Sequence, residues 1–212
     1  MSQGASDFFK ENNFVVISNV LDHQALALLR SYTISSVRRA DYLQTYHPDK
    51  FHGKLEGLFG DGQVNGAYYR YGDPMFDSLM VLIKGQVEEF TGLSLLENYT
   101  YWRMYETGND LERHIDRYSC EISATMCIGH DSSNLENPSD VWPIWVKDHN
   151  EIEIPIKLNP GDVLIYKGCE IEHWREEFKG LNQSQVFLHY NVDNQSSLIY
   201  DGRPILGIPK GW

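Results

Sequence analysis

Two histidines and one aspartate in this chain have the types and the spacing that suit a metal site. His114 and Asp116 are separated by one residue, and His173 follows after a strand-like stretch. Because residues i and i+2 of a strand point to the same side, His114 and Asp116 can reach one metal ion. Two imidazoles and one carboxylate form the facial triad, which binds non-haem Fe(II) and leaves the other coordination positions open. We therefore predict an iron site at these three residues.

The remaining metal-binding residue types carry weaker signals. The other six histidines have no partner at ligand spacing, so we expect ordinary hydrogen bonds for His23, His47, His52, His130, His149 and His189. Zinc is a less favoured metal, because no His/Cys pair has the spacing of a zinc site. The odd number of cysteines and the lack of a CxxC pair suit reduced thiols at Cys120, Cys127 and Cys169.

The elements that must position the triad are expected to be helices first and strands afterwards. Helical periodicity predicts helices over residues 5–12, 23–39 and 74–91. Strand signals cover residues 14–17, 99–105, 111–116, 121–129, 142–146, 151–157, 162–167, 170–175 and 185–191. Residues 40–73 follow neither period, and we expect a loop there that shapes a binding site.

This order of elements predicts a mainly β (α+β) fold. Its core would be a double-stranded β-helix, of the jelly-roll or cupin-like kind, with helices packed outside. A chain of 212 residues suits one domain, with helical support over about residues 1–95 and the jelly-roll core over about residues 96–200.

Composition narrows the class of protein. The formal net charge of -12 disfavours a dedicated nucleic-acid binder, because phosphate contacts need a basic surface. No apolar stretch reaches the length of a membrane span, and the first residues lack the pattern of a secretory signal. We expect a cytoplasmic protein.

Two motifs resemble those of a known enzyme family. The stretch YWRMYETGNDLERHIDR, from Tyr101 to Arg117, resembles the iron site of 2-oxoglutarate/Fe(II)-dependent dioxygenases, in particular the prolyl-4-hydroxylase-like branch. The stretch PGDVLIY, from Pro160 to Tyr166, followed by His173, is similar to the strand that leads to that family's distal histidine. The resemblance covers roughly residues 99–191.

The resemblance implies both cofactors and activity. Fe(II) would be bound by His114, Asp116 and His173, and 2-oxoglutarate would chelate the iron and react with O2 to give succinate. A carboxylate at Asp116 favours hydroxylation or another oxidation, since related halogenases carry a small residue there. Tyr105 is the candidate to donate its hydroxyl to the cosubstrate, with a core aromatic as the alternative. The substrate would be a small molecule, an amino acid or a protein side chain.

One departure from the family concerns the far carboxylate of 2-oxoglutarate. The family's Arg or Lys after the distal histidine is missing, because residues 181–190 contain neither. A buried carboxylate needs a charge-assisted partner. Arg175 and Arg103 are the candidates, with neutral hydrogen bonds from Gln183 and Gln185. Ion pairs with acidic neighbours, such as Glu106 or Glu176, remain an equal alternative for both arginines.

Other interpretations also stay open. The missing cation favours a cupin-type metal enzyme that uses no 2-oxoglutarate, and a non-catalytic jelly-roll binding protein is a rival of another class. Arg117 would contact substrate if its strand ends before it. Trp142 and Trp145 are expected to pack on a sheet. The loop side chains of His47, His52, Tyr68 and Tyr69 are candidates for a substrate lid.

Overall fold

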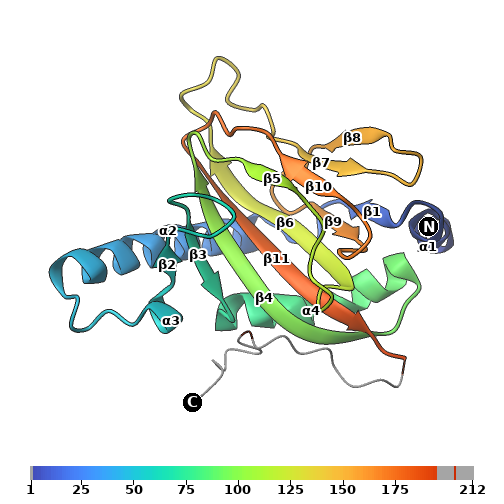
Figure 1. Cartoon of the computed structure of the whole chain (residues 1–212), viewed down its shortest axis with the longest axis horizontal. Coiled ribbons are helices and arrows are strands. Elements are labelled where there is room, and N and C mark those ends of the chain that lie inside the picture. Colours follow the sequence, from blue (N-terminus) through green and yellow to red (C-terminus); the bar gives the residue numbers. More distant parts are fainter. Residues whose placement is uncertain (1, 195–202, 204–212) are drawn as a thin grey trace.

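Two antiparallel sheets form the centre of the molecule (Figure 1). The computed structural model describes residues 2–194 and residue 203. The larger sheet has the strand order β1 (Phe14–Ile17), β9 (Val163–Tyr166), β6 (Ile122–Asp131), β11 (Asn182–Val192), β4 (Leu95–Glu106), β3 (Tyr68–Tyr71), β2 (Leu58–Phe59). The smaller sheet has the order β5 (Leu111–His114), β10 (His173–Arg175), β7 (Ile144–Lys147), β8 (Glu153–Ile156).

Helices cover one face of the larger sheet. They are α1 (Ser2–Asn12), α2 (His23–Tyr46), the short α3 (Gly53–Glu56) and α4 (Pro74–Thr91), and in Figure 1 α2 and α4 lie behind the strands. Trp102 and Met104 of β4 belong to the same buried cluster as Phe76 and Met80 of α4. Burial of each such side chain stabilises the fold by about 1.5–3 kcal/mol.

The sequence at the ends of α4 explains its boundaries. The side chain of Asp73 accepts a hydrogen bond from the amide of Met75, and Pro74 occupies the first turn, where no amide partner is needed. Gly92 ends the helix with φ of 69°, a left-handed conformation that glycine adopts without steric cost. The helix predicted over residues 74–91 is confirmed.

The opposite face of the larger sheet packs on the smaller sheet. Cys127 of β6 and Leu164 of β9 share a buried cluster with Ile144 and Val146 of β7. Because side chains alternate along a strand, Tyr101 and Tyr105 of β4 lie on this inner face while Trp102 lies against the helices. The inner face of β4 therefore carries the polar and aromatic side chains that can form a site.

Sequence periodicity predicted most elements but was wrong about the end of α2 and about residues 40–73. Helix α2 continues to Tyr46, seven residues beyond the expected end, because its last turns are mostly exposed and show no apolar period. The segment expected to be irregular contains α3, β2 and β3, and β3 pairs with β4 through Tyr69 and Arg103. Short strands near a sheet edge give little periodic signal.

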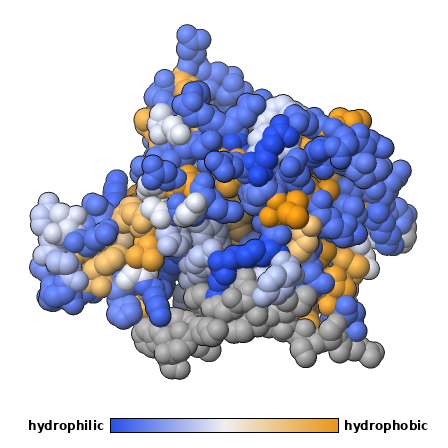
Figure 2. Space-filling view, in the orientation of Figure 1, coloured by the Kyte–Doolittle hydropathy of each residue, from blue (hydrophilic) through white to orange (hydrophobic). Residues whose placement is uncertain are grey.

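The expected combination of antiparallel sheets with N-terminal helices is confirmed. Residues 195–200, the end of the expected core, lie outside the described residues. Among the described helices, none combines the length and the apolar character needed to cross a membrane. The face drawn in Figure 2 is mostly hydrophilic, with apolar residues scattered between polar ones.

Candidate metal and cosubstrate site

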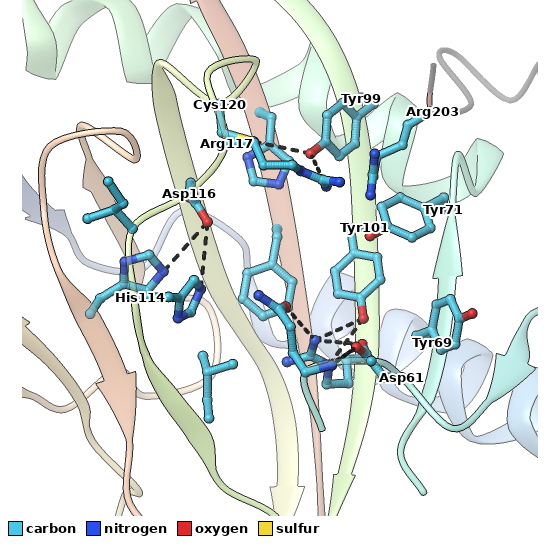
Figure 3. A pocket seen from close by; sticks show the side chains of 18 of the residues that line it. Asp61, Tyr69, Tyr71, Tyr99, Tyr101, His114, Asp116, Arg117, Cys120 and Arg203 are labelled. Carbon is cyan, nitrogen blue, oxygen red and sulfur yellow. Dashed lines mark hydrogen bonds and ion pairs between the residues drawn. The ribbon is translucent and has the colours of Figure 1, made fainter. Parts of the chain in front are cut away.

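A cavity of about 400 Å³ opens between the two sheets, a size suited to a small molecule. His114, Asp116 and His173 all line it. Figure 3 shows His114 and Asp116 on one side and the tyrosines of β3 and β4 on the other. The lining also includes Asp61, Gln63, Tyr69, Tyr71, Tyr99, Tyr101, Arg103, Leu111, Ile115, Arg117, Cys120, Tyr166, Phe187, His189 and Arg203.

The three predicted ligand residues converge. Strand β5 ends at His114, which is the register partner of His173 on β10. Nε2 of His114 lies 3.8 Å from Oδ1 of Asp116, and Nε2 of His173 lies 3.7 Å from the same oxygen. The strand does not reach Asp116 as expected, but the turn after β5 brings its carboxylate to the same point.

Backbone carbonyls orient both imidazoles. Nδ1 of His114 lies 2.8 Å from the carbonyl oxygen of Glu112, and Nδ1 of His173 lies 3.0 Å from that of Ile171. A carbonyl oxygen can only accept, so Nδ1 carries the proton in each ring. The lone pair is then on Nε2, the atom that faces Asp116.

The carboxylate of Asp116 is held from two sides. Its Oδ2 accepts a hydrogen bond from Oγ of Ser123 at 2.7 Å, which leaves Oδ1 facing the two imidazoles. Gly168 packs against it so closely that a Cβ there would lie 2.4 Å from the Cys120 carbonyl oxygen and 2.7 Å from Oδ2 of Asp116. Any larger residue at Gly168 would displace the carboxylate.

The electrostatic environment favours the protonation states that bind a cation. Burial lowers the pKa of His173 below its ordinary value, which favours the neutral imidazole. Burial alone raises the pKa of Asp116, but His173, His189 and the hydrogen bond from Ser123 outweigh it and bring the pKa below its ordinary value. A neutral imidazole at His173 and an ionised carboxylate at Asp116 are therefore expected near neutral pH.

Arg103 is buried and fully partnered. Its guanidinium donates to Oδ2 of Asp61 at 2.6 and 2.9 Å, to Oε1 of Gln63 at 3.1 Å and to the hydroxyl of Tyr105 at 2.8 Å. The ion pair considered with Glu106 is not formed, and Asp61 occupies that role. Tyr105, also fully buried, meets the ring of Trp142 edge-on at 5.0 Å.

Arg175 is buried to the same degree but has few partners. Nη1 donates to the carbonyl oxygen of Trp142 at 3.0 Å, and the guanidinium lies 4.6 Å from the centre of that indole ring. Nε and Nη2 are buried with no hydrogen-bond partner among the described residues. The ion pair considered with Glu176 is not formed. Burial lowers the pKa of Arg175, and Tyr105 and Tyr166 lie near enough to influence it.

The two glutamines of β11 complete this interior. Gln183 is the register partner of Tyr105, and Gln185 is that of Arg103. Nε2 of Gln183 donates to Oε1 of Gln185 at 3.0 Å, and Nε2 of Gln185 donates to Oγ1 of Thr125 at 2.7 Å. Strand β11 therefore carries two neutral amides at the positions paired with Tyr105 and Arg103.

Several site residues were missed by sequence reasoning. His189 lies near the triad, with Nδ1 3.0 Å from Oγ of Ser123, although it had been expected to be an ordinary histidine. Asp61 gave no signal, because its contact with Arg103 spans 42 residues of sequence. Tyr99 and Tyr101 were predictable from sequence, since they lie four and two residues before Arg103 and therefore share its face of β4.

The weaker candidates gave mixed outcomes. Arg117 lies beyond the end of β5 and lines the cavity. Tyr69 lines it too, but Tyr68 is in the helix-facing core and His47 contacts Tyr42 of α2. The rings of Trp145 and Trp174 stack with an angle of 10°. The ring of Trp142 packs against those of Tyr105 and Phe178.

Comparisons with known proteins support the fold. No protein-family model matches the chain, and no curated protein matches it significantly. A prolyl-4-hydroxylase from Pseudomonas putida is similar, with a TM-score of 0.65, 14% identity, and coverage of 92% of this chain and 100% of that one.

Two further solved structures match comparably well. The non-haem α-ketoglutarate-dependent epimerase SnoN has a TM-score of 0.65 and 11% identity, over 96% of this chain and 95% of that chain. HygX from Streptomyces hygroscopicus, with nickel and 2-oxoglutarate bound, has a TM-score of 0.64 and 12% identity, over 92% and 88%. The resemblance inferred from the two motifs is thus confirmed at the level of the fold, which is that of 2-oxoglutarate/Fe(II) oxygenases.

Proposed function

We propose that this protein is a non-haem Fe(II)- and 2-oxoglutarate-dependent oxygenase built on a single domain with a double-stranded β-helix core. It would hydroxylate a small molecule or an amino-acid or peptidyl side chain and release succinate and CO2. The observation that carries the proposal is the convergence of two Nε2 atoms on one oxygen of Asp116, within 3.8 Å, inside a cavity of this fold.

The donor set fits Fe(II). His114, Asp116 and His173 would hold the ion, because each offers one unprotonated donor atom and these atoms all lie within 4.8 Å of one another. When bound, iron with 2-oxoglutarate and O2 supplies the oxidation, in which one oxygen atom enters the substrate and the other enters succinate. The hydrogen bonds at Nδ1 would keep both imidazoles aimed at the metal.

The buried guanidinium of Arg175 fits the far carboxylate of 2-oxoglutarate. Two buried guanidinium nitrogens without partners, Nε and Nη2, are costly, and a carboxylate would satisfy their N–H groups with charge-assisted hydrogen bonds. Arg175 lies two residues after His173, so a cosubstrate that chelates the metal could extend toward it along β10. Tyr105, Gln183 and Gln185 would add hydrogen bonds from β4 and β11.

Arg103 would act on the cosubstrate indirectly, by orienting the hydroxyl of Tyr105. Its own donors are occupied by Asp61 and Gln63, and its Nη1 donates to the Tyr105 hydroxyl. A hydroxyl oxygen that accepts this bond has its own proton free to donate to a carboxylate. A buried cation is present at Arg175, although β11 carries none, and this disfavours a cupin-type enzyme that uses no 2-oxoglutarate.

Turnover tests the proposal. The full chain is incubated in air with Fe(II), 2-oxoglutarate and a panel of small metabolites, amino acids and peptides, and succinate is measured. We expect succinate from the wild type and none above background from the His173→Ala variant. If wild type and variant form succinate equally, or neither does so with any substrate, the proposed function is wrong.

A further inference from the structure

Three buried polar side chains form a row across the larger sheet, beside the metal-site residues. Ser123 of β6 is the register partner of His189 on β11 and of Tyr166 on β9. The hydroxyl of Ser123 lies 2.7 Å from Oδ2 of Asp116, and the hydroxyl of Tyr166 lies 3.3 Å from Nε2 of His173. The larger sheet therefore contacts two of the three candidate metal ligands, which come from other parts of the chain.

Asp116 needs this support more than the two histidines do. Strand β5 ends at His114 and strand β10 begins at His173, so sheet pairing fixes both of their backbones. Asp116 lies beyond the end of β5, where its amide donates to the carbonyl oxygen of Gly168 at 2.8 Å. That bond fixes the backbone but does not decide how the carboxylate is turned. Side-chain hydrogen bonds must decide which oxygen faces the imidazoles.

The direction of the hydrogen bonds follows from counting protons. An ionised carboxylate can only accept, so Ser123 directs its single hydroxyl proton to Oδ2 of Asp116. Nδ1 of His189 lies 3.0 Å from the same hydroxyl oxygen and must therefore donate to it. Donation thus runs from His189 to Ser123 and from Ser123 to Asp116, and each bond strengthens the next.

Close packing keeps this arrangement in place. A Cβ at Gly168 would lie 2.6 Å from Oγ of Ser123 and 2.7 Å from Oδ2 of Asp116, so the backbone packs directly against their hydrogen bond. The other carboxylate oxygen, Oδ1, lies 3.8 and 3.7 Å from Nε2 of His114 and His173, and Figure 3 shows His114 beside Asp116. One oxygen is used by the fold and the other faces the imidazoles.

We propose that Ser123 is a positioning residue that offers Oδ1 of Asp116, and not Oδ2, to a metal ion. His189 keeps the hydroxyl proton of Ser123 directed at Oδ2. A carboxylate that binds through one oxygen uses one coordination position, which leaves the remaining positions for other ligands. The inference rests on the metal site of the proposed function, but it does not depend on the reaction that follows.

Metal affinity tests the role of both residues. Co(II) is titrated into the tag-free full chain without 2-oxoglutarate, and visible absorption is recorded. Ser123→Ala should weaken Co(II) binding by about 10- to 100-fold, the usual effect of removing a group that orients a metal ligand. Ser123→Thr keeps the hydroxyl and should restore most of the affinity. His189→Leu should cost about fivefold, and His189→Asn, whose amide can donate from a similar place, should recover it.

A matched control separates positioning from ordinary stability. Ser184→Ala removes a buried hydroxyl from β11 on the helix-facing side, where it contacts Oγ1 of Thr33 at 2.7 Å and the guanidinium of Arg30. This variant should lower the free energy of unfolding and leave both the Co(II) affinity and the Co(II) spectrum unchanged. Ser123→Ala should change the spectrum, because the orientation of a ligand carboxylate changes.

Crystal structures of the metal-free wild type and of Ser123→Ala give a reading that needs no metal. We expect the carboxylate of Asp116 to turn in the variant, so that Oδ1 no longer faces both imidazoles. An unmoved carboxylate, or equal Co(II) affinities of wild type and Ser123→Ala, would overturn the positioning role. If Ser123→Ala does not fold, equal Co(II) affinities of His189→Leu and His189→Asn would overturn it instead.

Failure of this inference can be told apart from failure of the proposed function. A wild type that binds Co(II) more tightly than Ser123→Ala, yet forms no succinate with Fe(II), would refute the oxygenase function and support the positioning role. Succinate formation together with equal Co(II) affinities would do the reverse. A wild type that binds no Co(II) would overturn both.

Discussion

Arg103 of the larger sheet and Arg175 of the smaller sheet are equally buried, and they differ in how their donors are satisfied. Arg103 donates to an aspartate, a glutamine and two tyrosines. Arg175 donates to one carbonyl and leaves Nε and Nη2 unpartnered. A guanidinium that the protein satisfies completely holds the structure together. For the one that the protein leaves partly unsatisfied we propose a ligand, because the folded chain alone does not offset its desolvation.

The largest effect is expected at the satisfied arginine. Arg103→Met leaves Asp61 buried without its partner, and breaking a buried ion pair typically costs about 3–5 kcal/mol of the free energy of unfolding. Denaturant unfolding measures the loss, and the double variant Asp61→Asn with Arg103→Met should recover part of it. A loss below about 1 kcal/mol would mean that the cluster is not structural.

Arg175→Met should weaken ligand binding without lowering the free energy of unfolding. The affinity for 2-oxoglutarate should fall by about 10- to 100-fold, since charge-assisted hydrogen bonds contribute about 1.5–3 kcal/mol. The free energy of unfolding should stay the same or rise, because an uncompensated buried charge is removed. Calorimetric titration of 2-oxoglutarate into the Ni(II)-loaded protein measures the affinity. An unchanged affinity would remove Arg175 from the cosubstrate site.

A buried acid on the helix-facing side of the larger sheet, outside the cavity lining, provides a reference for structural loss. Asp73 is fully buried and accepts hydrogen bonds from the Tyr32 hydroxyl and from Nε1 of Trp102 at 2.9 Å. Asp73→Ala should lower the free energy of unfolding by about 1–3 kcal/mol. The affinity of the folded protein for 2-oxoglutarate should not change, and a change would show that the helix-facing core is coupled to the site.

The smallest effect is expected at the neutral amides. Gln183→Leu removes one hydrogen bond to Gln185 and one neutral donor to the cosubstrate, each worth about 1 kcal/mol. We expect about a fivefold loss in 2-oxoglutarate affinity, well below that of Arg175→Met. If Gln183→Leu weakens binding more than Arg175→Met does, the anchor lies on β11.

The contrast between the arginines also shows which features of the site can be predicted from the sequence. The convergence of His114, Asp116 and His173 was predictable, because their residue types and their spacing within two short motifs suit one metal ion. The face shared by Arg103 and Tyr105 followed from strand alternation. The roles of the two arginines did not, because they depend on distant partners. Asp61 lies 42 residues from Arg103, and only the fold shows that Glu176 does not pair with Arg175.

The most direct test of the account is anaerobic titration of Fe(II) and 2-oxoglutarate into the protein, followed by visible absorption. The chelate of 2-oxoglutarate on a facial-triad iron gives a weak charge-transfer band. We predict the band in the wild type only when both components are present, its loss in His173→Ala, and a higher 2-oxoglutarate midpoint in Arg175→Met. Absence of the band in the wild type, or its persistence in His173→Ala, would contradict the proposed site.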